Sequence, residues 1–448
     1  MIFYLDPFGC AKNQVDAENI MALLGGAGWT AAEDPEAADL IIVNSCGFIE
    51  SAKRESVNAV LAWRSRYPGK KILLAGCLAQ RYGAELAESL PEADGIFGNR
   101  NLAGIAGAAA ALGGSPAASA VKAPSAGAAG PGRRPLLSLP GSAYVKIAEG
   151  CDNRCSFCAI PLIRGGLKSR PAAPVLDECR TLLDRGVREL CLIGQDLGSY
   201  GGDLVPPADL PLLMEALSAL EGDFWIRLLY IHPDHFPPSL PDLCRRDRRF
   251  LPYFDIPFQH GSAPLLRSMN RRGSAETYLG LIERIRTALP GAVIRSTFMT
   301  GFPGETEADF AALLDFQERA RLDWLGVFTY SREEDTAAGR MKNRVPKKRA
   351  AERKRIVEER QIPITEKNMD RFTGRDYDVL VEEKIEGEEG LYLGRLYCHA
   401  PEVDGAAVIH GGDGPPLEPG TFIKGRVFAR TGFDLQVTPG PVIPWGRQ

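Results

Sequence analysis

The sequence has no run of apolar residues long enough to cross a lipid bilayer. It also has no basic and apolar leader, because Met1–Leu5 runs directly into Asp6 and Pro7. The first absence excludes a membrane-spanning helix, and the second gives no reason to expect export. We therefore expect a cytoplasmic protein that does not associate with a membrane.

An excess of positive charge is missing as well. Lys and Arg number 53 and Asp and Glu number 57, which gives a net charge of −4. This balance argues against a protein whose whole surface binds nucleic acid. A composition of 45% hydrophobic and 25% charged residues is typical of globular proteins. At about 150 residues per domain, a chain of 448 residues suggests roughly three domains.

The chain does contain ten cysteines. Thiols stay reduced in the cytoplasm, and a chain of this length needs no covalent cross-links, so a disulfide framework is not expected. Metal binding or redox chemistry is the better hypothesis.

Residues 1–106 alternate β-branched runs with amphipathic stretches, which predicts a doubly wound α/β domain. Strands are expected at Ile2–Leu5, Leu40–Val43 and Ile72–Ala75, and helices at Val15–Leu24, Ser51–Trp63 and Tyr82–Leu90. Residues 107–136 consist mostly of Ala, Gly, Ser and Pro, a composition that buries too little apolar surface to order a chain. We interpret them as a flexible linker.

Residues 137–373 repeat the alternation on a larger scale and predict a β/α part-barrel of six units, with its active face at the carboxyl ends of the strands. The strands are expected at Tyr144–Ala148, Glu189–Ile193, Trp225–Tyr230, Tyr253–Ile256, Val293–Met299 and Trp324–Thr329. The helices include Val175–Arg185, Leu210–Leu220, Glu305–Ala320 and a charged helix from Pro346 to about Arg371.

Residues 374–442 change to short strands with Gly-rich turns and predict a small antiparallel β-barrel. Its five strands are expected at Asp378–Glu382, Tyr392–Arg395, Ala406–Ile409, Phe422–Ala429 and Asp434–Val437. The fold class is therefore α/β, with a β-barrel at the carboxyl end.

The sharpest local signal is the segment GCDNRCSFC, which begins at Gly150 and contains Cys151, Cys155 and Cys158. Three thiolates can bind three irons of a 4Fe-4S cluster and leave the fourth iron open. The amino and carboxylate groups of S-adenosylmethionine can chelate that iron. The alternative is structural zinc, which needs four ligands and usually has paired C-x-x-C motifs. No further Cys or His lies near enough in sequence to complete such a set.

Three other cysteines each follow a predicted strand of the N-terminal domain: Cys10, Cys46 and Cys77. Loops at the carboxyl ends of parallel strands meet at one edge of an open sheet, so these thiols are expected to come together. They would bind a second 4Fe-4S cluster, again with one iron open. The alternative is that each is a small buried apolar residue. We interpret the remaining four as structural: Cys179, Cys191, Cys244 and Cys398.

Weaker candidates lie after other strands of the part-barrel. Gln195 and Asp196 follow the second strand, and Gly301 and Gly304 follow the fifth, where the backbone could approach a cofactor. Gln259 and His260 follow the fourth strand and could contact cofactor or substrate, although a lone His is more often structural. Arg164 could equally meet the substrate or form a salt bridge.

Together these features resemble the radical S-adenosylmethionine methylthiotransferase family over nearly the whole chain. The most similar branch is RimO: GCAKNQVD at Gly9 resembles its GCPKNLVD, and NSCGFIESA at Asn44 resembles its NTCGFIESA. Gly150–Arg170, Asp255–Gly261 (DIPFQHG) and Arg295–Glu305 (RSTFMTGFPGE) are also similar to that branch. Departures from the family pattern are Ala11 for a usual Pro, Gln14 for a usual Leu and Asp335 for a usual Gly.

The resemblance implies two 4Fe-4S clusters, a C-terminal TRAM barrel and methylthiolation of an aspartate in the small-subunit ribosomal protein uS12. One cluster would reduce S-adenosylmethionine, and the resulting radical would take hydrogen from the aspartate β-carbon. Sulfur from the other cluster would then couple to that carbon, and a second S-adenosylmethionine would supply the methyl group. An electron-donor protein and a monomeric enzyme are also expected.

Two alternatives remain at this point. The sister branch MiaB shares the iron chemistry and modifies tRNA, and a zinc-stabilised RNA-binding scaffold would have no catalytic role. From Arg375 onward the chain has twelve acidic and seven basic residues, a net charge of −5, which should repel a polyanion and attract a basic protein. A local basic patch of Lys424, Arg426 and Arg430 could still touch RNA.

Overall fold

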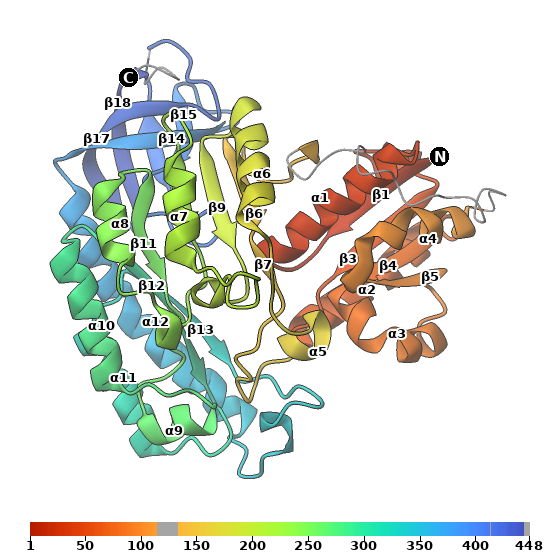
Figure 1. Ribbon diagram of the computed structural model, residues 1–448, viewed down its shortest axis with the longest axis horizontal. Coiled ribbons are helices and arrows are strands. Elements are labelled where there is room, and N and C mark those ends of the chain that lie inside the picture. The colour runs from red at the N-terminus through yellow and green to blue at the C-terminus, as the bar shows by residue number, and fades with distance from the viewer. Residues whose placement is uncertain (114–132, 413, 443–448) are drawn as a thin grey trace. The chain divides into compact units, whose positions relative to one another are not determined.

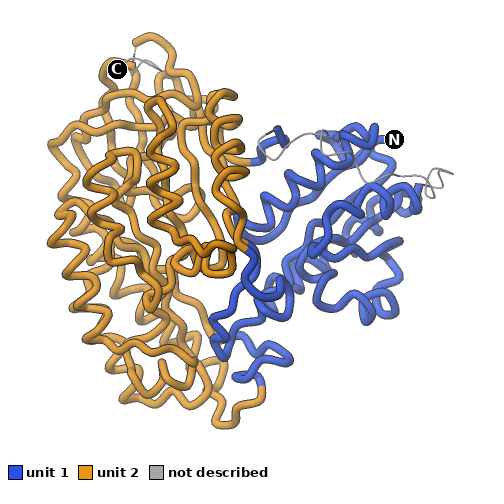
Figure 2. The backbone as a smooth tube through the Cα atoms, viewed as in Figure 1, with its two compact units in different colours: residues 1–137, 149–168, 331–339 blue, residues 138–148, 169–330, 340–448 orange. Residues whose placement is uncertain are grey.

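The computed structural model describes residues 1–113, 133–412 and 414–442. The chain divides into two compact units, shown in different colours in Figure 2. Unit 1 comprises residues 1–137, 149–168 and 331–339, and unit 2 comprises residues 138–148, 169–330 and 340–448. Unit 1 therefore combines the N-terminal domain with two segments from much later in the chain.

Unit 1 is built on a five-stranded parallel sheet with the strand order β2-β1-β3-β4-β5 (Figure 1). The bounds are β1 Ile2–Pro7, β2 Thr30–Ala31, β3 Leu40–Ser45, β4 Lys71–Gly76 and β5 Gly95–Gly98. The three predicted strands are confirmed and form the centre of the sheet. The edge strands β2 and β5 were not predicted, because they are short and lack a buried apolar run.

Alternate residues of the central strands face two separate cores, as a doubly wound fold requires. Leu40, Ile42 and Leu73 pack with α1 (Ala11–Gly26) and α4 (Ile105–Leu112). Ile41, Val43, Ile72 and Leu74 pack with α2 (Glu50–Arg66) and α3 (Cys77–Ser89). The doubly wound prediction for this domain is confirmed.

Helix α4 corrects the predicted linker, because Gly107 to Leu112 are helical, with Ala109 and Ala110 buried. The other end of that stretch is also packed: Arg134 is 1% exposed and its Nε lies 2.7 Å from Glu18 Oε2. Ala-rich sequence has high helix propensity, and a composition argument alone missed it. Residues 114–132 of the predicted flexible linker lie outside the described residues.

The first part of unit 2 is an open six-stranded parallel sheet with the order β13-β12-β11-β10-β9-β6. Its strands are β6 Ser142–Lys146, β9 Glu189–Ile193, β10 Trp225–Leu228, β11 Phe250–Asp255, β12 Val293–Thr300 and β13 Trp324–Thr329. The predicted part-barrel is confirmed. A two-stranded sheet, β7 Ala148–Glu149 and β8 Lys168–Ser169, lies at the two ends of the cysteine loop.

Helices connect these strands, and several begin at residues that cap their first turn. Ser274 and Thr306 each form a capping box, and the Asp209 side chain accepts from Leu212 N. The helices are α5 Ile160–Arg164 (in unit 1), α6 Ala172–Asp184, α7 Leu210–Ser218, α8 Leu240–Arg246, α9 Ala263–Ser268, α10 Ala275–Ala288, α11 Glu307–Ala320 and α12 Lys347–Met369. Short 3-10 turns are η1 Pro35–Ala37, η2 Asn99–Gly104, η5 Leu197–Ser199, η6 Pro233–His235, η7 Ala338–Arg340 and η8 Asp370–Phe372. No helix of the described residues has the length and apolarity to span a membrane.

The end of unit 2 is a closed five-stranded barrel, blue in Figure 1, with the order β14-β15-β16-β18-β17. Its strands are β14 Asp376–Lys384, β15 Leu391–Arg395, β16 Ala407–His410, β17 Phe422–Thr431 and β18 Asp434–Val442. Arg395 contacts Ser142 Oγ at 2.8 Å and Glu189 Oε2 at 2.5 Å, and these are the first residues of β6 and β9. The small barrel therefore packs at the amino ends of the parallel strands, away from their carboxyl ends.

Candidate functional site

The structure brings Cys10, Cys46 and Cys77 to one edge of the unit 1 sheet. Cys10 directly precedes α1, Cys46 directly follows β3, and Cys77 is the first residue of α3 after β4. Since β1, β3 and β4 are adjacent parallel strands, their carboxyl ends meet at this edge. The edge thus collects three thiols from three separate loops.

Glycines allow these loops to approach closely. A Cβ on Gly9, whose φ is +104°, would lie 3.1 Å from the Cys46 Cβ. A Cβ on Gly47 would lie 2.8 Å from the backbone of Cys77. Neither loop has room for a larger residue, so the close approach of these loops depends on glycine.

The thiols differ in exposure and influence one another. Cys10 is exposed, Cys46 is intermediate and Cys77 is buried. Burial raises the pKa of Cys46, and nearby Cys10 raises it further while Arg164 lowers it. Burial also raises the pKa of Cys77 to about 12, with Arg164 again acting in the opposite direction. Cys10 and Cys46 also raise the pKa of Cys77, which indicates that the three thiols lie near one another.

The second triad lies on a single loop of unit 1. A Cβ on Gly150, with φ +71°, would come within 2.0 Å of the Gly166 carbonyl oxygen, so the two ends of the loop are in close contact. Cys151 N donates to Gly165 O at 3.1 Å, and Cys158 N donates to Cys155 O at 3.0 Å. Cys151, Cys155 and Cys158 are all of intermediate exposure. The loop thus holds its thiols at the surface with its own backbone.

The loop and the N-terminal domain belong to the same compact unit. Ala159 and Ile163 pack against Cys77 in one buried cluster. Arg100 donates to the carbonyl oxygens of Ile163 at 3.1 Å and Leu162 at 2.8 Å. Both cysteine triads are therefore parts of one structural unit, which the sequence did not predict.

The donor sets fit two 4Fe-4S clusters. All ten cysteines lie in the described residues, and none forms a disulfide. Each triad offers three thiolates, which hold three of four irons and leave one for another ligand. Cys77 Sγ also receives hydrogen bonds from Arg164 Nη2 at 3.2 Å and Asn99 Nδ2 at 3.3 Å, and it lies 3.7 Å from Asn13 Oδ1. The two N–H donors would stabilise a thiolate ligand at this position. In the described chain, no three His, Cys, Asp or Glu side chains converge on a single-ion site.

Asp196 has a set of internal partners at the carboxyl end of β9. Its Oδ1 accepts from Gly198 N at 3.0 Å and His232 N at 2.9 Å. Its Oδ2 lies 2.7 Å from His235 Nδ1, and this hydrogen bond raises the pKa of His235. Asp196 thereby fixes the loops after β9 and β10, and Gln195 lies directly before it. Cofactor binding by Gln195 and Asp196 stays a prediction.

His260, Gly301 and Glu305 form a buried network in unit 2. His260 is fully buried; its Nδ1 accepts from Ser262 N at 3.0 Å, and its Nε2 lies 3.3 Å from Glu305 Oε1. Glu305 also accepts from Gly301 N and lies 2.9 Å from Arg353 Nη1. A Cβ on Gly301 would meet Ala350 at 2.3 Å. These contacts are internal, and cofactor binding by His260, Gly301 and Gly304 also stays a prediction.

Several residues beside the N-terminal triad were not singled out from the sequence. Asn13 donates to Asn44 O and Ser45 O, both at 3.2 Å, and so links α1 to the end of β3. Glu333, from the segment 331–339, lies 2.6 Å from Arg81 and 3.0 Å from Lys53. Asn13 lies in the segment GCAKNQVD, which resembles the family motif. No local sequence pattern marks Asn99 or Glu333, because their contacts are with residues far away in the chain.

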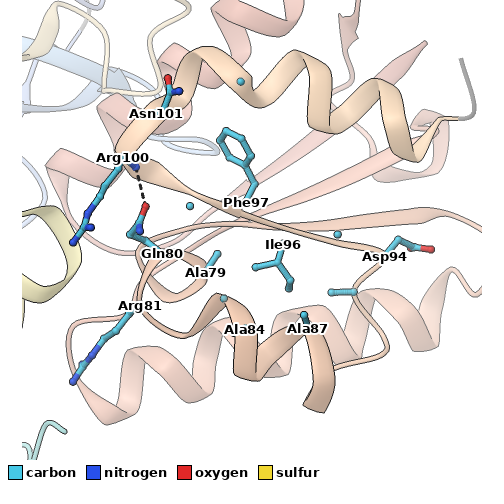
Figure 3. A pocket seen from close by; sticks show the side chains of 15 residues that line it. Ala79, Gln80, Arg81, Ala84, Ala87, Asp94, Ile96, Phe97, Arg100 and Asn101 are labelled. Carbon is cyan, nitrogen blue, oxygen red and sulfur yellow. Dashed lines mark hydrogen bonds between the residues drawn. The ribbon is translucent and has the colours of Figure 1, made fainter. Parts of the chain in front are cut away.

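A separate shallow groove of about 880 Å³ lies along the edge strand β5. Figure 3 shows Ala84 and Ala87 of α3 and Ile96 and Phe97 of β5 around it, with Arg100 N bonded to Gln80 Oε1 at 3.1 Å. Its lining includes none of the six cysteines and none of the predicted cofactor-binding residues. The chemistry of the triads therefore does not extend into this groove.

Three family models match the chain in order. The uncharacterized protein family UPF0004 matches residues 2–98, the radical SAM superfamily matches residues 145–316, and the TRAM domain matches residues 373–439. These three regions correspond to the parallel sheet of unit 1, most of the part-barrel together with the cysteine loop, and the closed barrel.

Solved structures with a similar fold are radical S-adenosylmethionine enzymes. TsrM from Kitasatospora setae, with cobalamin and a [4Fe-4S] cluster bound, matches with a TM-score of 0.54 at 15% identity over 75% of this chain and 76% of that chain. The cobalamin-dependent enzyme OxsB matches with a TM-score of 0.50 at 12% identity over 80% of this chain and 56% of that chain. At these identities the likeness establishes the fold alone.

Curated relatives are far more similar in sequence. The ribosomal protein uS12 methylthiotransferase RimO of Treponema denticola is 47% identical, over 96% of this chain and 99% of that protein. The protein of the same name from Aquifex aeolicus is 40% identical, over 95% of this chain and 94% of that protein. With its three matching domains and near-complete coverage, the chain belongs to the RimO family of radical S-adenosylmethionine methylthiotransferases.

Proposed function

We propose that this protein transfers a methylthio group to the β-carbon of an aspartate in ribosomal protein uS12. The observation that carries the proposal is the presence of two three-cysteine sites in one compact unit of a RimO-family chain. Methylthiolation needs both a radical source and a sulfur source, and two sites with one open iron each match that pair of requirements.

We assign the ligands as Cys151, Cys155 and Cys158 for one 4Fe-4S cluster and Cys10, Cys46 and Cys77 for the other. When bound, the first cluster with S-adenosylmethionine supplies a radical that removes hydrogen from the aspartate, and the second supplies sulfur that a further S-adenosylmethionine methylates. The six cysteines would hold the irons as thiolates. Gly9, Gly47 and Gly150 let the loops approach one another, and α5 packs the cysteine loop against Cys77.

S-adenosylmethionine is proposed to contact the loops at the carboxyl ends of the parallel strands. Asp196 holds the loops after β9 and β10 together, so Gln195 is presented from a fixed backbone. The Glu305 network fixes the loop of Gly301 and Gly304, and Gly304 N is itself bonded to Asn343 O at 2.9 Å. We infer that these two loops and His260 form the cofactor site, and that most contacts with the cofactor are made by backbone atoms.

The surface of the small barrel favours a protein substrate. Asp376 and Asp378 on β14 lie opposite Arg426 and Lys424 on β17, and each pair forms an ion pair. Arg430 lies 2.8 Å from Asp370 and 3.3 Å from Glu366. The basic patch that could have contacted RNA is therefore neutralised by neighbouring carboxylates, and the barrel as a whole is acidic. This supports the basic uS12 over tRNA.

We further propose that the protein is a monomer, that it receives electrons from a donor protein, and that it works in the cytoplasm without associating with a membrane. An external reductant is required because the chemistry consumes electrons that no group of the chain provides. The cysteines are consistent with the location, since all ten are unpaired by disulfides.

The test uses the full chain, reconstituted anaerobically with iron and sulfide and supplied with reductant and S-adenosylmethionine. Purified uS12 and unmodified tRNA are offered in parallel and analysed by mass spectrometry. We expect methylthiolated aspartate in uS12 and no methylthiolated nucleoside. A methylthiolated nucleoside without uS12 modification would replace this proposal with the tRNA reaction. A variant with Cys10, Cys46 and Cys77 replaced by Ala is the matched control.

A further inference from the structure

Arg164 is a buried guanidinium between the two cysteine triads. It is the last residue of α5, the short helix that follows the Cys151–Cys158 loop, and its side chain is 3% exposed. A buried arginine is costly unless its charge is paired and its N–H groups are hydrogen-bonded. Its partners therefore indicate its role.

Two carboxylates already balance this charge. Arg164 Nη2 lies 2.9 Å from Asp16 Oδ2, and Nη1 donates to Glu149 Oε1 at 2.8 Å. The third contact is to sulfur: Nη2 also donates to Cys77 Sγ at 3.2 Å. Because Asp16 and Glu149 neutralise the cation, the contact with Cys77 is not needed for charge balance. The contact instead places a positively charged hydrogen-bond donor beside the Cys77 sulfur.

Cys77 Sγ has a second donor on another element. Asn99, the first residue of η2, donates from Nδ2 at 3.3 Å. One sulfur thus receives an N–H from an amide and an N–H from a charged guanidinium. Hydrogen bonds to ligand sulfur and nearby charge are main determinants of iron–sulfur reduction potential. The Arg164 guanidinium lowers the pKa of Cys77 and outweighs the Asp16 carboxylate, which raises it. The net effect of this pair on the sulfur therefore stabilises the more negative, reduced cluster.

The position of Arg164 relative to Cys77 is fixed by the packing of α5. Arg100 binds the last carbonyl groups of α5, at Leu162 and Ile163, and Ile163 packs against Cys77. Arg100 does not contact the sulfur in these bonds, so packing and sulfur contact are carried by different residues. They can therefore be separated by substitution.

We propose that Arg164 is a positioning residue for the cluster held by Cys10, Cys46 and Cys77. Its guanidinium supports the Cys77 thiolate, raises the reduction potential of that cluster and joins the loop of one triad to a ligand of the other. The inference rests on the proposed function only in requiring a cluster at this triad.

The experiment starts from the full chain with Cys151, Cys155 and Cys158 replaced by Ala, so that only the N-terminal cluster is present. Arg164→Met is introduced into this parent, and the potential is measured by redox titration followed by electron paramagnetic resonance. We expect a potential more negative than in the parent and a roughly 10- to 100-fold weaker retention of iron against a chelator. Arg164→Lys keeps the charge but lacks the planar fork, so its potential should fall between the two.

Arg100→Met is the matched control, because it removes two bonds to α5 but no bond to sulfur. We expect it to shift the potential of the parent much less than Arg164→Met does. Asn99→Leu removes the neutral donor and should shift the potential in the same direction as Arg164→Met, by less.

An unchanged potential in Arg164→Met would overturn the inference, and so would an equal shift in Arg100→Met. If Arg164→Met retains no iron or does not fold, Arg164→Lys and Asn99→Leu decide: parent potentials in both overturn it, and shifts in both support it. A parent that binds no iron at all would instead refute the two-cluster proposal, which is a distinguishable result.

Discussion

The two cysteine triads reach similar chemistry by different routes. Cys151, Cys155 and Cys158 come from one loop, whose ends are joined by the close contact of Gly150 with Gly166. Cys10, Cys46 and Cys77 come from three loops at the end of a parallel sheet. The first arrangement is set by local backbone geometry, and the second is set by the register and packing of whole strands.

Because of this difference, we expect the two triads to lose iron in response to different substitutions. The triad of Cys151, Cys155 and Cys158 (the loop triad) is held by bonds within its own segment, such as Cys151 N to Gly165 O at 3.1 Å. The triad of Cys10, Cys46 and Cys77 (the sheet triad) depends on strands β1, β3 and β4. It also depends on helices α1 and α3, which begin next to Cys10 and at Cys77. We therefore expect changes in the N-terminal sheet to affect mainly one cluster, and changes in the Cys151–Cys158 loop to affect mainly the other, with Arg164 as the link between them.

The largest expected effect comes from removing each triad in turn. Replacement of Cys151, Cys155 and Cys158 by Ala should halve the iron, from about eight to about four per chain, and abolish cleavage of S-adenosylmethionine. Replacement of Cys10, Cys46 and Cys77 should also halve the iron but leave deoxyadenosine formation measurable. Iron and sulfide analysis and chromatography of the nucleoside check both. Full iron in the second variant would refute the sheet triad.

The second effect uses one glycine from each site. Gly47→Ala places a Cβ 2.8 Å from the Cys77 backbone and should release mainly the N-terminal iron. Gly150→Ala places a Cβ 2.0 Å from Gly166 O at a φ of +71° and should release mainly the loop iron. Spectroscopy of each variant in the two triple-Ala backgrounds assigns the loss.

Gly25→Ala is the control for both glycine variants, because nothing lies within 4 Å of the added Cβ and the residue lies within α1. It should keep all of the iron. Equal losses from both clusters in Gly47→Ala would show that the two sites fail together and that the distinction between them is wrong.

Much of the fold follows from the sequence because its buried strands are continuous apolar runs. Glu189–Ile193 and Trp324–Thr329 have the same bounds in prediction and structure, and Leu40–Val43 differs from β3 only by two polar residues at its end. The edge strand Gly95–Gly98 was missed because a short strand with a Gly at each end has no such run. Helix α4 was missed because Ala and Gly were counted together as linker composition.

The site was predictable to the extent that it depends on spacing and topology. The loop triad needs only its own motif, and the sheet triad needs only the rule that parallel strands end at one edge. The partners of Arg164 could not be predicted, because Asp16, Cys77 and Glu149 are far apart in sequence. Nor could the burial of His260 with Glu305, which depends on how β11 and β12 pack.

A third, smaller effect concerns carboxylates that stabilise unit 2 and hold no iron. Glu305→Gln removes a buried charge that faces Arg353 at 2.9 Å and should cost roughly 3 kcal/mol of unfolding free energy, because it leaves a buried cation with one exposed partner. Iron content should stay unchanged in both clusters. Thermal unfolding and iron analysis check this, with Glu307→Gln at the exposed partner as a control of much smaller effect.

Loss of iron in Glu305→Gln at a temperature where the variant is folded would contradict this separation. It would mean that the network around His260 acts on a cluster as well as on stability.

The smallest expected effect is a pH dependence of the unfolding free energy that comes from Glu189. This residue is the first of β9 in unit 2 and belongs to neither triad. Burial alone would raise the pKa of Glu189, but the guanidinium groups of Arg395 and Arg227 outweigh it and lower this pKa to about 2. A carboxyl whose pKa is lower in the folded state stabilises the fold at pH values above its unfolded pKa of 4.5. That stabilisation is lost as pH falls from about 4.5 toward 2, and about 1 kcal/mol of it should be lost by pH 4.

Glu189→Gln cannot titrate, so the difference in unfolding free energy between it and the wild type should narrow by this amount between pH 6 and pH 4. Urea unfolding of the iron-free full chain, followed by circular dichroism, measures the difference at both values. A difference that stays constant would show that Glu189 titrates alike in the folded and unfolded chain, and that the pair with Arg395 contributes packing and hydrogen bonds without stabilising the charge.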